Sequence, residues 1–76
     1  MSNIVHLVQP LSTREREVVE YVVLGYTNRE IGLACGTSPN TVKNQLQSVF
    51  RKVGAASRAE LVRIAFELSL VRANAA

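Results

Sequence analysis

The sequence predicts a small all-α domain of four helices, and three observations support this fold class. Four segments of the 76-residue chain begin at a Ser or Thr of the kind that caps helix N-termini. Apolar residues recur at helical spacing within these segments. A glycine follows each of the first three, at Gly25, Gly36 and Gly54, where it can end a helix. β-branched residues are frequent, but the caps and the 3.6-residue period outweigh their weaker helix propensity.

The first predicted helix begins after Ser12. Ser12-Thr13-Arg14-Glu15 is a capping box, in which the Ser12 hydroxyl and the Glu15 carboxylate can each accept a hydrogen bond from the other residue's backbone N–H. Apolar residues then recur at helical spacing until Gly25, namely Val18, Val19, Val22 and Val23.

The second predicted helix is short. Thr27-Asn28-Arg29-Glu30 is another capping box, and Gly36 ends the helix. Gly32 lies inside it, where a glycine costs roughly 1 kcal/mol relative to Ala. Either the third helix crosses close enough to Gly32 to need a very small residue there, which we favour, or the glycine is merely tolerated. The residues expected to face inward are Ile31, Ala34 and Cys35.

The third predicted helix begins at the N-cap Ser38, with Pro39 at its first position, and runs to Val53. Because Gly36 can adopt a positive φ, the chain can turn sharply between the second and third predicted helices. The third helix then projects from the surface at a steep angle. Its apolar stripe consists of Val42, Leu46, Val49, Phe50 and Val53. Its opposite face carries Asn40, Lys43, Asn44, Gln47 and Arg51.

This polar face has the residue types that contact base edges in a DNA major groove. Asn and Gln can bond adenine bidentately, Lys can bond guanine acceptors, and no carboxylate is present to repel phosphate. The net charge is +3, and the stretch between Ile31 and Ala59 holds four basic residues and no acidic one. The face therefore favours double-stranded DNA as the partner, whereas an ordinary solvated helix face is the alternative.

The fourth predicted helix begins at Ser57 and runs to about Leu70. One of its apolar stripes, assigned to the core, consists of Leu61, Ile64, Ala65 and Leu68. A second stripe has little left to cover it in so small a domain, and an exposed apolar stripe indicates a partner surface. Alternatively, Phe66 covers the N-terminal residues Ile4, Val5 and Leu7. The second stripe consists of Ala59, Val62, Phe66 and Leu70.

Composition excludes several other classes. With 47% hydrophobic and 20% charged residues the chain is globular, and no apolar run approaches the ~20 residues of a membrane span. The N-terminus lacks the features of a secretory signal, so a cytoplasmic location is expected. Cys35 and His6 are single, and no nucleophile–base pair or Gly-rich phosphate loop is evident. We therefore predict no enzyme, no metal site, no cofactor and no small-molecule ligand, with Cys35 a small buried residue.

The chain contains two long motifs, LSTREREVVEYVVLGYTNREIG and SPNTVKNQLQSVFRKVGAASRAELV. In this order they resemble the LuxR/FixJ-type (GerE-like) helix-turn-helix domains of bacterial transcription regulators, from Leu11 to about Phe66. The resemblance implies a DNA-binding domain at 11–72, with its second and third helices forming the DNA-binding corner, a linker or tail at 1–10 and a tail at 73–76. In the family the linker commonly follows a receiver or ligand-binding domain. The departures from the family pattern are Cys35, Thr37 and Gln45.

The resemblance also implies roles for individual residues. Bases would be contacted by Lys43, Asn44 and Gln47. The DNA backbone would be contacted by residues at two helix N-termini and by two cations, namely Thr27, Ser38, Asn40, Thr41, Arg51 and Lys52. The second stripe of the fourth helix would form a weak homodimer on an inverted repeat. RNA polymerase is a further candidate partner, and the expected location is the nucleoid.

Two other functions are compatible with parts of the sequence. A sigma-factor-like promoter-element domain would share the LSTREREVV opening, but SRAELVRIA fits the LuxR-type pattern better. A helical module that binds protein and not DNA would explain the uncovered stripe of the fourth helix. It would not explain a polar face without acidic residues on the third.

Overall fold

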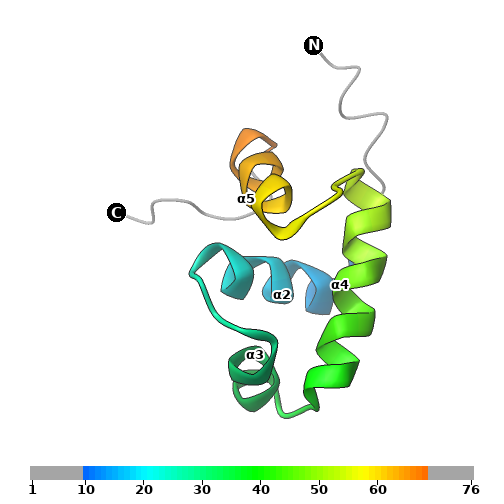
Figure 1. Cartoon of the computed structure of the whole chain (residues 1–76). Coiled ribbons are helices and arrows are strands. Elements are labelled where there is room, and N and C mark those ends of the chain that lie inside the picture. Colours follow the sequence, from blue (N-terminus) through cyan, green and yellow to red (C-terminus); the bar gives the residue numbers. More distant parts are fainter. Residues whose placement is uncertain (1–9, 69–76) are drawn as a thin grey trace.

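The structure, a computed structural model, describes residues 10–68. Within this range it contains no strand and four α-helices, α2 (Thr13–Val23), α3 (Asn28–Cys35), α4 (Pro39–Val53) and α5 (Arg58–Glu67). Figure 1 shows α2 in the middle of the molecule, α3 below it, α5 above it and α4 alongside. The prediction of an all-α fold with four helices is confirmed.

Each helix begins at the predicted N-cap. The cap hydroxyl accepts a hydrogen bond from the backbone N–H three residues on, at 3.1 to 3.2 Å, in Ser12, Thr27, Ser38 and Ser57. Both predicted capping boxes are closed, because Glu15 accepts from the Ser12 N–H at 2.9 Å and Glu30 from the Thr27 N–H at 2.8 Å. These bonds satisfy backbone donors that have no partner within the helix, and they fix where each helix begins.

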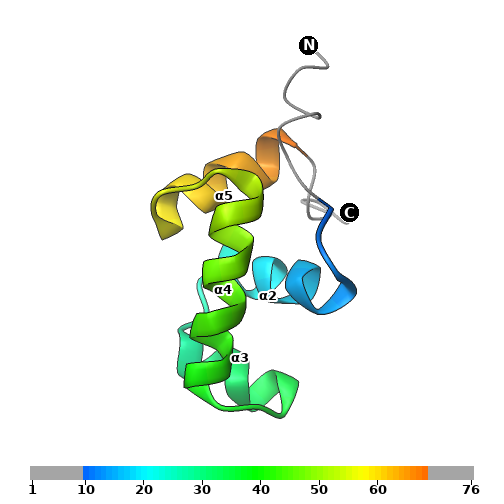
Figure 2. The ribbon, with the colours of Figure 1, turned by 90° about the vertical axis from the view of Figure 1, so that its right-hand side faces the viewer.

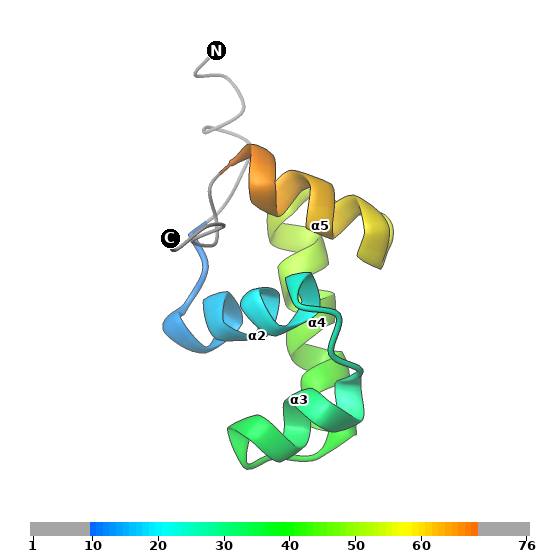
Figure 3. The same cartoon turned by 90° about the vertical axis from the view of Figure 1, so that its left-hand side faces the viewer.

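The core lies where α2 meets the other helices. α2 packs against α4 on one side and α5 on another, so it holds α4 in place (Figure 3). Phe50 is half-buried and packs against this core. The rest of the predicted α4 stripe is buried, as expected. The buried hydrophobic residues are Val18, Val19, Val22, Ile31, Val42, Leu46, Val49, Val53, Leu61 and Ala65.

The turn between α3 and α4 is tight. Gly36 ends α3 with a left-handed φ of 73°, and the Thr37 N–H donates to the Gly32 carbonyl at 2.9 Å. A Cβ on Gly32 would lie only 2.6 Å from the carbonyl oxygen of Thr37 and 3.4 Å from the nitrogen of Pro39. The predicted close approach at Gly32 is confirmed. The approaching backbone is that of the turn and the very start of α4.

The predicted inward face of α3 is partly wrong. Ile31 is buried and Cys35 is half-buried, but Ala34 is exposed and Gly32 is buried. The reason is the backbone of the turn, which packs onto Gly32 and makes its side of the helix the inner one. Ala34 lies about 200° further around the helix axis and therefore points outward.

The two predicted stripes of α5 are less distinct than expected. Leu61 and Ala65 are buried, whereas Ile64 and Leu68 are half-buried. Val62, assigned to the uncovered stripe, is half-buried and packs against the core, because α5 contacts both α2 and α4. α5 ends at Glu67, three residues before the expected end.

Some predictions fall outside the described residues. These concern Leu70, His6, the residues Ile4, Val5 and Leu7, and most of the predicted tails at 1–10 and 73–76.

Candidate nucleic-acid interface

The outer face of α4 is uncovered along its length (Figure 2). All five polar residues predicted for it are exposed. Within the described part of the chain, the side chains of Lys43, Asn44 and Gln47 have no hydrogen-bond or ion-pair partner. Their donors and acceptors are therefore available to a ligand. This face comprises Asn40, Lys43, Asn44, Gln47 and Arg51, and it is called the polar face of α4 below.

Two helix N-termini carry the other residues predicted to lie near DNA phosphates. At the start of α4, Ser38 and Thr41 are exposed and joined by a hydroxyl–hydroxyl bond of 3.1 Å. Thr27 is exposed at the start of α3, on the α2–α3 corner. The first N–H groups of a helix and its positive dipole end favour anions. Both positions are thus chemically suited to phosphate.

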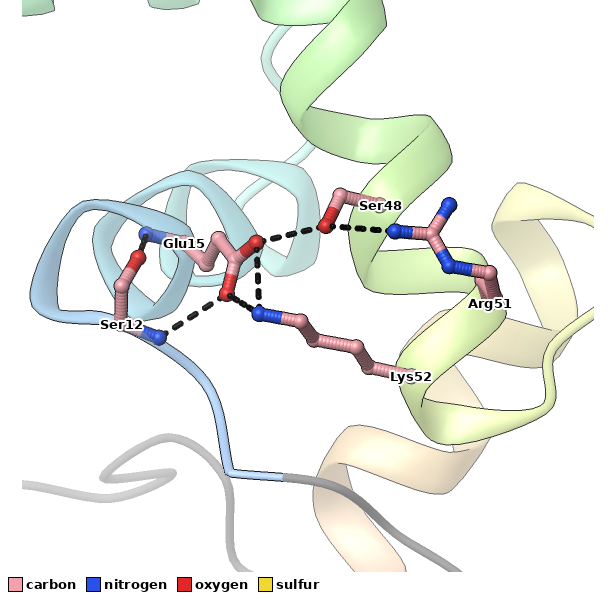
Figure 4. Close-up of polar contacts among 5 residues, drawn as sticks. All are labelled: Ser12, Glu15, Ser48, Arg51 and Lys52. Carbon is pink, nitrogen blue, oxygen red and sulfur yellow. Dashed lines mark hydrogen bonds and ion pairs between the residues drawn. The ribbon is translucent and has the colours of Figure 1, made fainter.

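The other end of α4 is tied to α2 through Glu15 (Figure 4). Lys52 Nζ donates to Glu15 Oε1 at 2.9 Å and to Oε2 at 3.2 Å, and the Ser48 hydroxyl donates to Oε2 at 2.8 Å. Arg51 in turn donates to the Ser48 oxygen at 3.4 Å. Together with the Ser12 N–H, these groups surround a carboxylate whose side chain is only 11% exposed. The residues Ser12, Glu15, Ser48 and Lys52 are called the Glu15 network.

The network keeps Glu15 ionised. The pKa of Glu15 is lowered from 4.5 to about 2, and the largest cause is the hydrogen bond from the Ser12 backbone N–H. Burial opposes this by disfavouring the charged form, and the bonds from Lys52 and Ser48 act with the Ser12 N–H. Glu15 therefore carries a full negative charge at neutral pH.

Lys52 is placed differently from the polar face of α4. Its ammonium is directed to Glu15, and its side chain is 24% exposed. Its positive charge is therefore already balanced within the protein. A contact between Lys52 and the DNA backbone stays a prediction, and Arg51 is the more exposed cation at this end of α4.

Gln45, one of the departures from the family pattern, is half-buried. Its Oε1 is buried and has no hydrogen-bond partner within residues 10–68. It therefore does not belong to the polar face of α4.

Two residues that join the helices received no site role from the sequence. Glu15 was assigned only to its capping box, and Arg58 only to the positive charge around α4. Arg58 donates to the Asn28 Oδ1 at 2.9 Å and to the Tyr26 carbonyl at 2.6 Å. The long-range partners of both residues lie 30 to 37 positions away in the chain, so no local pattern could have found them.

The predicted dimer surface is only partly free. Ala59 is exposed and Phe66 is 47% exposed, whereas Val62 is half-buried. The uncovered apolar surface on α5 is thus centred on Phe66.

Other kinds of site find little support in the part of the chain that the structure describes. No group of three or more His, Cys, Asp or Glu side chains is arranged to hold a metal ion between residues 10 and 68. No helix in that range is long and apolar enough to cross a membrane.

The geometry defines a class of protein. A short helix, a left-handed glycine turn and a longer helix with an exposed, acid-free polar face make up a helix-turn-helix DNA-binding domain. Comparison with known families gives the particular group: the family model for bacterial regulatory proteins of the luxR family matches residues 9–65. The chain therefore belongs to the luxR family, and the resemblance noted from the sequence is confirmed.

Curated relatives are named as transcriptional regulators. The chain is 36% identical over 62 residues to the transcriptional activator protein YukR of Yersinia ruckeri, covering 82% of this chain and 27% of that protein. It is 47% identical over 55 residues both to the transcriptional activator RamA of Corynebacterium glutamicum and to the regulatory protein FixJ of Azorhizobium caulinodans. Those matches cover 72% of this chain but 20% and 26% of the relatives.

The chain thus spans about a quarter of the length of these relatives. No solved structure matches it significantly. That this chain is not an enzyme stays a prediction.

Proposed function

We propose that this domain binds specific double-stranded DNA as the output domain of a transcription regulator, with the N-terminal half of α4 in the major groove. The observation that carries the proposal is the polar face of α4, where Lys43, Asn44 and Gln47 are exposed and have no partner within the described residues. No acidic residue lies on α4. These three side chains would contact base edges. Such a domain would act in the cytoplasm, on the nucleoid.

The residues near the two helix N-termini would hold the DNA backbone. Thr27 at α3, and Ser38, Asn40 and Thr41 at α4, would place backbone N–H groups and hydroxyls against phosphates. Arg51 would add a charged contact, and Lys52 a weaker one because Glu15 already balances its charge. Such contacts orient the protein on the duplex without carrying sequence information.

The first experiment separates base contacts from charge. A preferred site is selected from random DNA, and gel-shift titrations compare the parent with Lys43→Ala and Asn44→Ala. Each variant should lose roughly 5- to 150-fold in affinity for that site, because a bidentate base contact is worth about 1 to 3 kcal/mol. Binding to unrelated DNA should fall much less.

The matched control is Arg63→Ala, which removes one positive charge from an exposed residue paired with Glu60 and Glu67 on α5. It should keep the parent's preference for the selected site. If the Lys43 and Asn44 variants kept that preference too, neither residue would contact bases. If the parent selected no DNA at all, the alternative of a protein-binding module would stand.

Arg51→Ala tests a backbone contact by a different measure. Loss of one phosphate contact should lower affinity for all DNA and reduce the slope of log K against log salt concentration by about 1. Sequence preference should stay the same. An unchanged slope would mean that Arg51 only bonds Ser48 and solvent.

We further propose that two copies pair weakly through α5 and occupy an inverted repeat. Ala59 and Phe66 are exposed there and Val62 is partly so, whereas Leu70 lies outside the described residues. So small a contact is below the area that stable dimers bury, so pairing should occur mainly on DNA. RNA polymerase remains a further candidate partner, with no described residue assigned to it.

Phe66→Glu tests the pairing. A charge that must be desolvated in the interface should abolish cooperative filling of a full repeat, while affinity for one half-site stays near the parent value. Leu24→Glu is the control, because Leu24, the C-cap of α2, is an apolar residue at 68% exposure. Cooperative binding by the Phe66 variant would exclude α5 as the dimer surface.

A further inference from the structure

Arg58 joins two parts of the domain that are far apart in the sequence. It is the first residue of α5, and its guanidinium reaches the corner between α2 and α3. Nη1 donates to the side chain of Asn28 at 2.9 Å, and Nη2 donates to the carbonyl of Tyr26 at 2.6 Å. These two acceptors lie on either side of Thr27, the N-cap of α3.

The local setting of Arg58 does not account for its position. A cation at the first residue of a helix faces the positive end of the helix dipole, which disfavours it. The nearby Glu60 does not compensate, because its carboxylate bonds the Ala56 N–H and Arg63. Within the described residues Arg58 has no carboxylate partner. Its bonds to the α2–α3 corner are therefore the contacts that hold it there.

Asn28 has an alternative role that the bond to Arg58 prevents. Asn is among the best N-cap residues, and Asn28 directly follows the cap Thr27. If its Oδ1 were free, it could cap the helix itself, and α3 would then begin one residue later. With Oδ1 bound to Arg58, the cap stays at Thr27, whose hydroxyl accepts from the Glu30 N–H at 3.2 Å.

We propose that Arg58 is a positioning residue for DNA binding, which fixes the first turn of α3 so that Thr27 and the free N–H groups face the DNA backbone in one register. It acts through Tyr26 and Asn28 and does not itself contact phosphate. This inference rests on the proposed function, which places Thr27 at the backbone. A planar guanidinium can serve two acceptors at once, whereas a lysine ammonium at this point would reach only one of them well.

The first test uses the free protein, so it does not depend on DNA binding. In amide NMR spectra, Arg58→Ala should shift the resonances of residues 27–31 and speed their hydrogen exchange, while Lys43 to Gln47 keep the parent values. The resonance shifts and exchange rates of Arg58→Lys should lie between those of the parent and those of Arg58→Ala. Arg63→Ala, which removes an arginine bonded only within α5, should leave residues 27–31 unchanged.

The second test measures DNA binding with a double-mutant cycle. Arg58→Ala should lower affinity for all DNA by about two- to tenfold. Asn28→Ala removes the competing cap oxygen together with the bond to Arg58, so the double variant should be no weaker than Arg58→Ala alone. The slope of log K against log salt should stay at the parent value. Thr27→Val, in contrast, should lower affinity further in either background.

Two outcomes would overturn the inference alone. Parent-like amide spectra for Arg58→Ala would show that the first turn of α3 does not depend on it. A slope reduced by about 1, with the effects of the two substitutions multiplying, would show that Arg58 contacts phosphate directly. Failure of the parent to bind any DNA would instead overturn the proposed function, and the DNA-binding role of Arg58 with it.

Discussion

The two halves of α4 are built for different tasks. In the N-terminal half, Lys43, Asn44 and Gln47 are exposed and have no partner among the described residues. In the C-terminal half, Ser48 and Lys52 bond the Glu15 carboxylate of α2. Both halves contribute buried residues to the same core.

The difference shows how a helix can present unsatisfied polar groups without losing its orientation. Groups that are to contact a ligand must be free of partners in the protein, so they cannot fix the helix themselves. The Glu15 network and the tight turn at Gly32 supply the orientation from either end. A rigid attachment of this kind lowers the conformational cost of binding.

The largest effect is expected from removing the charge of the Glu15 network. Glu15→Gln should destabilise the domain by about 3 kcal/mol, because it leaves the partly buried Lys52 ammonium without a counter-charge. Denaturant unfolding at neutral pH measures this. Glu17→Gln is the control, since Glu17 is half exposed and pairs with Arg14 at a loose 3.5 Å, so a change below about 0.5 kcal/mol is expected. Equal losses of unfolding free energy in Glu15→Gln and Glu17→Gln would contradict a special role of the Glu15 network in holding α4.

The same network predicts a dependence of stability on pH. The pKa of Glu15 is about 2 in the folded protein and near 4.5 otherwise, so its contribution is fully present above pH 4.5 and lost as pH falls through 2. The parent should lose about 2 to 3 kcal/mol from this residue across that window. The Glu15→Gln variant has no carboxyl group to protonate at this position, so the unfolding free energies of the two proteins should become equal in acid. A stability gap at pH 2 as wide as at pH 7 would contradict the prediction.

A smaller effect is expected at the turn that positions the N-terminal half. Gly32→Ala should destabilise by about 1 kcal/mol net, because a Cβ 2.6 Å from the Thr37 carbonyl outweighs the better helix propensity of Ala. Ala34→Gly is the comparison, since Ala34 is exposed and only propensity is lost there, again about 1 kcal/mol. The two differ in DNA affinity, which should fall for Gly32→Ala alone. A more stable Gly32→Ala variant would show that the turn can relax.

The smallest effect is expected on the polar face of α4. Lys43→Ala and Asn44→Ala should change stability by no more than about 0.5 kcal/mol, with Asn44→Ala neutral or slightly stabilising because Ala is the better helix former. Thermal unfolding checks this. A large loss in either variant would mean that the N-terminal half also supports the fold.

The fold was predictable because its signals are local. Each N-cap acts within three residues, so Ser12, Thr27, Ser38 and Ser57 could be recognised from the sequence and are all observed. The inward face of α3 was less predictable. Which side of a two-turn helix is buried depends on what packs against it. Here the Thr37 carbonyl packs against Gly32 and leaves Ala34 exposed, and Thr37 belongs to the turn after the helix.

The candidate site was predictable in part for the same reason. The polar face of α4 follows from helical periodicity alone, and its residues are exposed as expected. The ion pair between Lys52 and Glu15 could not be predicted, because Glu15 lies 37 residues before Lys52 in the chain. The capping box already accounted for the presence of a carboxylate at Glu15. Glu15 thus has a local role that the sequence predicts and a long-range role that it does not.

The Glu15 network also has a consequence for the rates of folding and unfolding. Its bonds join residues 33 and 37 positions apart, so they can form only after α2 and α4 have docked. Contacts that form late contribute little to the folding barrier and mainly slow unfolding. We therefore expect Glu15→Gln to raise the unfolding rate and leave the refolding rate nearly unchanged in a stopped-flow chevron. The carboxylate that orients α4 would then also set how long the domain stays folded.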